Sequence, residues 1–346
     1  MPFNTFKIVQ PLTYPSHLKV FQGELNDFFW CCIAIWAFDR SMRLARTAYF
    51  GLIPRFLKGI KATASYDDAA EIIRLDVTDL LSKKATTPGY YYYLYAPGDL
   101  QSYQSHPFTL CSWRQTTNHT SQLPSTAADA KTSQPPSTTP SSPTTKQTHS
   151  LLIRPYRGFT SRLRNNLTQT PSSTSTLTIL LEGPYGRALD LRSFSNVLII
   201  AGGSGITAAI SHSNFLLPAG NTSVHVVWAV QNSSIVDHVC ENELKEAMED
   251  PRFELVVYET RKASADVEKM AAASSSSSAA GNMRGVQYGR PDIGAMIREA
   301  RQNCASNLAV VTCGPPRMAD ACRAAVVEVL GEKGPGVEFY DEALGW

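Results

Sequence analysis

A glycine-rich turn at residues 201–207, AGGSGIT, has the residue types that bind an anion. It follows the apolar run Val197–Ile200 and precedes a stretch that predicts a helix. Glycines there let the backbone approach a ligand closely, and free N–H groups at a helix start attract a pyrophosphate. The match to G-x-G-x-x-G is imperfect, because the chain reads G-G-S-G-I-T. A tight turn without a ligand is the alternative, but the strand–turn–helix context favours binding.

Two further turns could take part in the same chemistry. In TCGPPRM, residues 312–318, Cys313 is expected at the carboxyl end of a parallel strand, where the ligands of such sheets collect. A single cysteine is more commonly a small buried hydrophobic residue, although Gly314 and the two prolines mark a specific turn. EGPYG, residues 182–186, is interpreted from the residues alone as a turn between domains.

The segment SHPFTLCSW, residues 105–113, places a histidine, a proline, an aromatic ring and a hydroxyl in four successive positions. It lies between a tyrosine-rich run and a long Ser/Thr/Pro tract. Considered by itself, it is interpreted as an edge strand that begins with His-Pro.

The elements that must position these residues fall into two units. From about residue 61 to 190, short β-branched and aromatic runs alternate with Pro/Gly turns, which predicts an antiparallel β-barrel. Its expected strands are residues 71–77, 89–95, 108–113, 150–156 and 177–183. From residue 191 to 346, strands and helices alternate, which predicts a parallel sheet with helices on both faces. Its expected strands begin at residues 196, 223, 253 and 307. One helix is expected directly after the glycine-rich turn, and three more are expected over residues 237–249, 292–300 and 318–330.

Two low-complexity segments interrupt these units. Residues 115–150 are rich in Ser, Thr, Pro and Ala, and residues 263–281 contain AAASSSSSAAG. Neither can bury enough apolar surface to offset the entropy of ordering, so both are expected to be flexible insertions. The expected division is therefore an N-terminal segment 1–60, a barrel domain 61–190 and an α/β domain 191–346.

Composition excludes several classes of protein. With 32 Lys and Arg against 30 Asp and Glu, the net charge is +2, so nothing in the bulk electrostatics indicates a nucleic-acid partner. The seven cysteines include no CxxC pair, which argues against a zinc site and a disulfide framework and suits a reducing compartment.

No signal peptide is expected in the N-terminal segment, whose most apolar run is FFWCCIAIWAF, residues 28–38. This run is too short for a bilayer, which needs about 20 apolar residues. Arg40, Arg43 and Arg46 follow it at helical spacing. Two interpretations stay open: a buried helix with a basic exposed face, or the cytosolic end of a membrane helix.

Taken in order, HPFT, IRPYRGFT, EGPYG, AGGSGIT and CGPPRM resemble the motifs of the ferredoxin-NADP reductase superfamily. Within it, the chain is most similar to the flavin- and nicotinamide-binding half of fungal ferric/cupric metalloreductases, relatives of the NADPH oxidases. IAIWAFDRSMRLAR also resembles the end of the last membrane helix of these reductases. The resemblance extends from about residue 30 to 346, apart from the two insertions.

The resemblance implies an FAD site on the barrel and a nicotinamide coenzyme site on the α/β domain. The implied FAD contacts are His106, Pro107, Phe108, Thr109, Arg154, Gly158, Phe159 and Thr160, with Thr160 near a helix N-cap. The implied turn between the domains contains Gly183, Pro184 and Gly186. The implied coenzyme contacts are Gly202, Gly203, Ser204, Gly205, Ile206, Thr207, Gln231, Gly314 and Pro315. Cys313 is implied near the nicotinamide, and Trp346 is a candidate gate that stacks on the flavin, unless it is an ordinary frayed end.

Two departures from the relatives affect the cofactors. Relatives often carry an arginine after the strand VHVVWAV, where this chain has Gln231, so Arg261, Lys262 or Arg290 would have to supply the charge for a 2′-phosphate. NADPH is the expected coenzyme, with NADH as the alternative. Before His106 the chain has only His17, so no haem site is expected within it.

The expected function is electron transfer from NAD(P)H through FAD to a ferric or cupric chelate. One alternative is an NADPH oxidase-type module that reduces oxygen, and another is a non-catalytic truncated paralogue that binds a partner reductase. Membrane association with cytosolic FAD and NAD(P) domains is expected, or a soluble cytosolic protein if the chain is complete.

Overall fold

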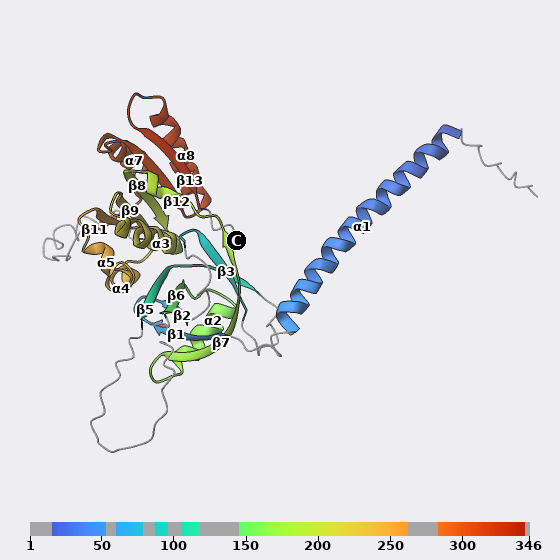
Figure 1. Cartoon of the computed structure of the whole chain (residues 1–346), viewed down its shortest axis with the longest axis horizontal. Coiled ribbons are helices and arrows are strands. Elements are labelled where there is room, and N and C mark those ends of the chain that lie inside the picture. Colours follow the sequence, from blue (N-terminus) through green and yellow to red (C-terminus); the bar gives the residue numbers. More distant parts are fainter. Residues whose placement is uncertain are drawn as a thin grey trace, which may run out of the picture. The chain divides into compact units, whose positions relative to one another are not determined.

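The computed structural model describes residues 16–52, 60–78, 87–95, 105–117, 145–261 and 283–342, and most of both expected insertions lies outside these ranges. The chain divides into two units: residues 1–58 with 98–104, and residues 59–97 with 105–346. The first unit contains helix α1, Ser16–Leu52, and the second contains two β-sheets (Figure 1).

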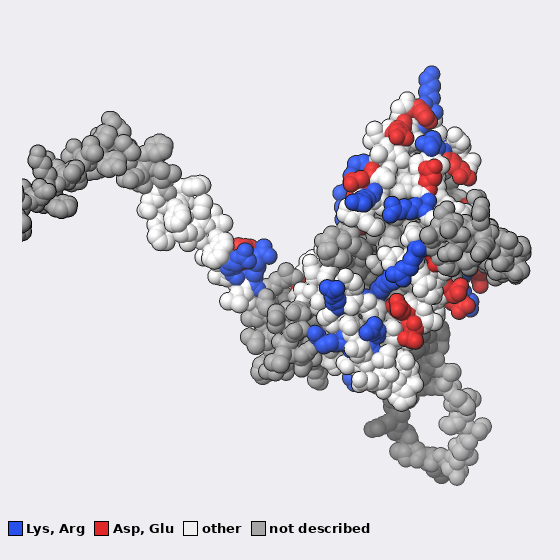
Figure 2. All heavy atoms as spheres, turned by 180° about the vertical axis from the view of Figure 1, so that it is seen from behind, with Lys and Arg blue, Asp and Glu red and all other residues white. Residues whose placement is uncertain are grey.

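Helix α1 exposes the apolar run found in the sequence. Phe28 is 68% exposed and Trp36 is 61% exposed, so this helix does not bury the run within its own unit. The two interpretations of the run stay predictions. Asp39 accepts a hydrogen bond from Arg43 one turn later, and charged side chains mark this end of an otherwise uncharged stretch (Figure 2). Among the described residues, no helix is both long and apolar enough to cross a membrane.

Seven antiparallel strands form the first sheet, in the order β4-β3-β7-β1-β2-β6-β5. Its strands are β1 Ile60–Asp67, β2 Ile72–Thr78, β3 Tyr90–Tyr95, β4 His106–Thr109, β5 Ser112–Thr117, β6 Thr145–Ile153 and β7 Thr174–Gly186. Strands β4 and β5 stand at opposite edges of this order, yet only residues 110 and 111 separate them. The sheet therefore curls back on itself, and we call it the barrel. The expected single strand 108–113 is in fact these two strands.

Strand β1 was not expected from the sequence. Its inward positions alternate as a strand requires, but two of the three are alanines, Ala62 and Ala64, beside Tyr66. Small residues do not produce the β-branched pattern from which strands are predicted. The neighbouring strands β2 and β7 supply the apolar surface that this strand lacks.

Six parallel strands form the second sheet, in the order β11-β10-β9-β8-β12-β13, and with its helices we call it the α/β domain. Its strands are β8 Asn196–Gly202, β9 Ser223–Val230, β10 Phe253–Glu259, β11 Met283–Tyr288, β12 Asn307–Cys313 and β13 Gly336–Asp341. Its helices are α3 Ile206–Leu216, α4 Ser234–Asn242, α5 Lys245–Met248, α7 Ile293–Gln302 and α8 Pro316–Leu330. The edge strands β11 and β13 were not expected, and the expected helix 237–249 is broken into α4 and α5.

Both faces of this sheet are covered, as the alternating strand–helix pattern predicts. Val197 and Ile199 of β8 belong to the core under α3, α4 and α5, whereas Leu198 and Ile200 belong to the core under α7 and α8. Because side chains alternate across a strand, two buried faces require an apolar residue at nearly every position. This is why β8 contains an uninterrupted apolar run.

The barrel and the α/β domain share one core and a set of polar contacts. Arg74 on β2 forms an ion pair at 2.5 Å with Glu243, whose side chain is fully buried. Burial raises the pKa of Glu243, and the Arg74 charge opposes that shift. Asp67, at the end of β1, pairs with His238 of α4 at 2.7 Å. These contacts hold the two sheets of this unit together.

Candidate functional site

The two central turns of the α/β domain meet at the carboxyl edge of the sheet. The next strand in the sequence, β9, lies on one side of β8 in the sheet, and β12 pairs with β8 on the other side. The strand order therefore reverses between β8 and β12. Ligands of open α/β sheets bind at such a switch point. The turns that follow these two strands, residues 202–205 and 313–315, are those that the sequence analysis selected.

These turns pack backbone against backbone. A Cβ atom on Gly205 would lie 1.9 Å from the Cys313 carbonyl oxygen, and one on Gly202 would lie 2.7 Å from the Pro315 ring. No side chain other than hydrogen fits such an approach. The structure therefore brings together the two motifs, more than 100 residues apart in the sequence.

The N-terminus of α3 is open to a ligand. Gly203 has φ of +55°, and nothing lies within 4 Å of the position where its Cβ would be. Trp228 donates a hydrogen bond to the Gly203 carbonyl at 3.0 Å and Thr207 donates one to the Ser204 carbonyl at 3.0 Å, which fixes the turn. No side chain caps the start of α3. Uncapped N–H groups at a helix start fit the pyrophosphate of a dinucleotide.

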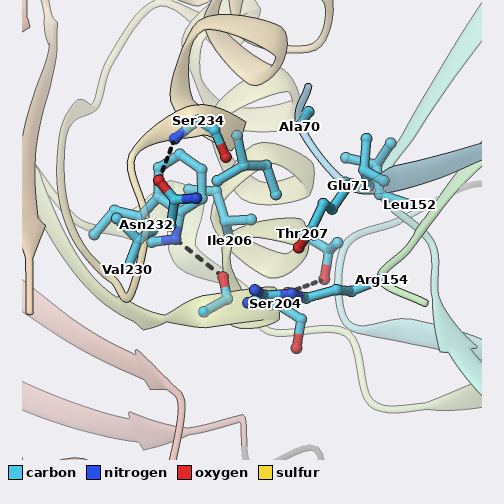
Figure 3. A pocket seen from close by; sticks show the side chains of 14 residues that line it. Ala70, Glu71, Leu152, Arg154, Ser204, Ile206, Thr207, Val230, Asn232 and Ser234 are labelled. Carbon is cyan, nitrogen blue, oxygen red and sulfur yellow. Dashed lines mark hydrogen bonds between the residues drawn. The ribbon is translucent and has the colours of Figure 1, made fainter. Parts of the chain in front are cut away.

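A pocket joins this turn to the barrel (Figure 3). Its empty volume is about 510 Å³, which includes open solvent at its mouth. Ser204 and Thr207 line it from the turn, while Glu71 and Arg154 reach in from the barrel. Asn232, just after β9, completes the opposite wall. Arg154, implied as an FAD contact, therefore lines the same pocket as the dinucleotide turn.

The two implied flavin elements lie side by side in the barrel. The rings of His106 on β4 and Phe159 are stacked, with centroids 5.2 Å apart and 9° between the planes. Phe159 begins helix α2, Phe159–Thr168, after Gly158 with φ of 67°. Gly158 is the N-cap of this helix, two residues before Thr160, and the Thr160 hydroxyl accepts a hydrogen bond from the Tyr156 N–H at 3.0 Å.

Strand β4 presents buried polar atoms without partners. The Thr109 hydroxyl and His106 Nε2 have no hydrogen-bond partner among the described residues. Burial lowers the pKa of His106, and the Arg162 charge acts in the same direction. Buried polar groups normally find partners, so two orphans on one short strand fit a ligand with polar ring atoms. FAD is such a ligand, and Pro107 and Phe108 between them are half-buried.

The implied domain turn, Gly183 to Gly186, is instead the end of strand β7. Tyr185 pairs with Tyr91 and Gly186 pairs with Tyr90 of β3. A Cβ on Gly186 would lie 2.2 Å from the Gly89 carbonyl oxygen, so this glycine permits close strand packing. The chain leaves the barrel only after it.

Cys313 is fully buried, and burial raises the pKa of its thiol to about 12. The charges of Glu342 and Asp341 act in the same direction. A thiol with this pKa stays protonated at neutral pH and is not a nucleophile. At this site Cys313 acts as a small neutral group.

Other implied residues lie at the edge of the site or outside the described residues. Gln231 is exposed and does not line the pocket, whereas its neighbour Asn232 does. Arg261 and Arg290 are exposed, just beyond β10 and β11. Lys262 and the candidate gate Trp346 fall outside the described residues.

Sequence reasoning missed several residues of the site. Asn232 could have been found, because it follows the same strand end that drew attention to Gln231. Glu71 and Trp228 carry no such signal, since the fold alone brings them to the pocket. His212 and Glu342 contact each other although 130 residues separate them, and only the fold brings them together.

Known proteins match this chain across both sheets. Residues 194–327 match the ferric reductase NAD binding domain. The ferric/cupric reductase transmembrane component 1 of Candida albicans is 27% identical over 344 residues, which cover 93% of this chain and 40% of that protein. The ferric/cupric reductase transmembrane component 2 of Saccharomyces cerevisiae is 24% identical over 345 residues, 92% of this chain and 43% of that protein. This chain therefore spans less than half the length of these relatives.

A solved structure has the same fold. The ferredoxin NADP+ reductase from Neisseria gonorrhoeae, determined with bound FAD and NADP, is 14% identical, with a TM-score of 0.51 over 83% of this chain and 99% of that one. The resemblance found in the sequence is confirmed. The chain is similar to the fungal ferric/cupric reductases over more than nine-tenths of its length, and it shares the two-domain fold of the ferredoxin NADP+ reductase.

Proposed function

We propose that this chain is a flavin-dependent reductase module that oxidises NAD(P)H and delivers the electrons to a ferric or cupric chelate. The observation that carries the proposal is the juxtaposition of two kinds of site in one unit. Orphaned polar atoms and stacked rings on the barrel suit a flavin, and an uncapped helix N-terminus at the sheet switch point suits a dinucleotide.

The residues divide the work between binding and positioning. His106, Thr109 and Phe159 would hold the flavin ring system, which supplies two-electron to one-electron redox chemistry when bound. Backbone N–H groups from Gly203 onward, with Arg154, would hold pyrophosphate charge, since a guanidinium and helix N–H groups both favour anions.

NADPH is the coenzyme that we propose for this site. Arg261 and Arg290 follow β10 and β11, the two strands next to β9 on that side of the sheet. Both guanidinium groups are exposed, so they are available to a 2′-phosphate near Asn232 and Ser234. NADPH should then give a higher kcat/KM than NADH, and Arg261→Ala or Arg290→Ala should narrow the difference.

The proposed acceptor and location follow from the relatives, which are named ferric and ferric/cupric reductase transmembrane components. A metal chelate is a small substrate, and it needs only one-electron delivery from a reduced flavin. The exposed apolar run of α1 is consistent with attachment to a membrane.

The test is titration of the purified full chain with FAD, followed by turnover with NADPH or NADH and a ferric chelate, a cupric chelate or oxygen as acceptor. We expect a flavin spectrum that saturates at one FAD per chain and faster reduction of the chelates than of oxygen. A colourless protein that takes up no FAD would refute the flavin assignment, and faster oxygen consumption would refute the acceptor.

A further inference from the structure

A buried histidine and a carboxylate meet beside the coenzyme site without a role in the function proposed above. His212 lies on α3, and its Nε2 is 2.8 Å from Oε1 of Glu342, the residue after β13. The side chains are 1% and 14% exposed, respectively. A carboxylate at such a position loses part of its solvation free energy, and a single hydrogen bond offsets only part of that loss. The pair therefore needs an explanation.

The Glu342 carboxylate lies where the barrel meets the α/β domain. Its backbone N–H donates to the Thr312 carbonyl at 2.9 Å, which ties it to the end of β12 beside Cys313. Its Oε1 lies 3.4 Å from the position a Cβ would take on Gly89, just before β3. The first residue of β3, Tyr90, accepts a hydrogen bond from the Leu110 N–H, directly after Thr109. The carboxylate thus stands between the flavin strand and the Cys313 turn.

A neighbouring carboxylate is already neutralised. Asp341 lies 3.1 Å from the guanidinium of Arg323, on α8. Glu342 is paired with an imidazole rather than with a guanidinium. Its negative charge is therefore compensated less completely than that of Asp341, and it can act on a ligand bound beside the Cys313 turn.

We propose that His212 is a positioning residue that holds the Glu342 carboxylate toward the nicotinamide end of the coenzyme site. There the carboxylate favours the cationic, oxidised nicotinamide over the neutral, reduced form. In the reaction the C4–H bond of the dihydronicotinamide breaks, both electrons leave with the hydrogen for the flavin, and the ring gains one positive charge. A negative charge fixed nearby stabilises this developing charge without reorganisation. The inference rests on the proposed function, since it assumes that the coenzyme site binds a nicotinamide coenzyme.

The test uses graded variants of the pair and a matched pair elsewhere in the same domain. His212→Leu removes the hydrogen-bond donor, His212→Gln keeps one near the position of Nε2, and Glu342→Gln removes the charge. The control pair is His225 on β9 and Glu254 on β10, which are also 2.8 Å apart and lie away from the coenzyme site. Its variants, His225→Leu and Glu254→Gln, change a histidine–carboxylate contact outside the proposed site.

The measurements separate the two oxidation states of the coenzyme in the FAD-loaded full chain. Titration gives the Kd of the oxidised coenzyme, and anaerobic rapid mixing gives the rate of flavin reduction and its saturation by the reduced coenzyme. For Glu342→Gln and His212→Leu we expect the oxidised coenzyme to bind about tenfold more weakly, equivalent to about 1.4 kcal/mol. Flavin reduction should slow by a similar factor, while saturation by the reduced coenzyme stays nearly unchanged. His212→Gln should recover most of the loss, and the control variants should match the wild type.

Equal weakening of both coenzyme forms would overturn the proposal, because loss of packing alone does not discriminate charge. Unchanged affinity in Glu342→Gln would also overturn it. If His212→Leu fails to fold, His212→Gln and Glu342→Gln still decide the question.

A measurement without FAD separates this inference from the proposed function. Hydrogen exchange at the Glu342 amide should quicken in His212→Leu but not in His212→Gln, because the imidazole holds the chain after β13. Unchanged exchange in His212→Leu would overturn the positioning role even in a chain that takes up FAD. A wild-type chain that takes up no FAD would instead refute the function proposed above.

Discussion

The barrel and the α/β domain build their halves of the candidate site by different means. The flavin half depends on side chains: a stacked ring pair and two buried polar atoms, on His106 and Thr109, that lack partners among the described residues. The coenzyme half depends on backbone: Gly203 and Gly205 shape a turn whose N–H groups remain open to a ligand. A planar ring needs a few polar atoms at set positions, whereas a pyrophosphate is matched by several N–H groups. The two halves should therefore fail in different ways when altered.

The largest effect is expected from adding one methyl group to the coenzyme half. Gly205→Ala would place a Cβ 1.9 Å from the Cys313 carbonyl oxygen and 2.8 Å from its carbonyl carbon. Both are backbone atoms, so no rotamer change relieves the clash, and we expect a loss of about 3 kcal/mol of unfolding free energy. Denaturant unfolding of the flavin-free chain measures it.

The control for this variant is Gly336→Ala, at the start of β13. Nothing lies within 4 Å of its Cβ position, so we expect a change of at most about 0.5 kcal/mol. Equal stability of the two variants would show that the turns separate easily, and the contrast between the halves would then be lost.

A smaller effect of mixed sign is expected in the flavin half. Thr109→Val replaces a buried hydroxyl without a partner by a methyl group of the same shape. The flavin-free chain should gain about 1 kcal/mol, because an unsatisfied polar group no longer has to be buried. FAD should bind about tenfold more weakly, because a hydrogen bond to the ligand is lost. Unfolding and FAD titration of the same preparation measure both effects.

Thr222→Val is the matched control. Thr222 is also buried, but its hydroxyl donates to the Phe194 carbonyl at 2.9 Å. This variant should lose stability and leave FAD affinity unchanged. If Thr109→Val also destabilised the flavin-free chain, its hydroxyl would have a partner within the fold, and the flavin half would not be preformed for a ligand.

A third effect concerns pH and the barrel core. His149 on β6 is 1% exposed, neither ring nitrogen has a partner among the described residues, and burial lowers its pKa. As the pH falls below about 6.5, this histidine is therefore protonated in the unfolded chain before it is protonated in the folded chain. The free energy of unfolding falls in that range, and the contribution of His149 is fully present only at higher pH. The contribution is at most about 1.4 kcal/mol per pH unit.

His149→Leu should remove this part of the pH dependence, measured as unfolding free energy between pH 7 and pH 5. His106, whose pKa is also lowered, remains in both proteins and provides a common background. An identical pH slope in the variant would show that His149 is not the group that titrates.

The sequence was most informative where chemistry is local. The glycine-rich turn was recognised because strand, turn and helix follow one another within residues 196–216, and the parallel sheet because buried strands are continuously apolar. Strand β1 was missed because Ala62 and Ala64 fill its inward positions. Strands β11 and β13 were missed because edge strands pair on one side only, so their sequences carry a weaker apolar signal.

The sequence by itself thus determined the two-domain architecture, the order of the motifs and the class of ligand that each suits. Tertiary structure alone decided which residues face one another. It set Asn232 rather than Gln231 in the pocket wall, brought Glu71 and Arg154 against the glycine-rich turn, and joined His212 to Glu342. The reason is physical: propensity and periodicity act over a few residues, whereas these contacts depend on how whole sheets pack, and that packing is settled by the summed burial of both cores.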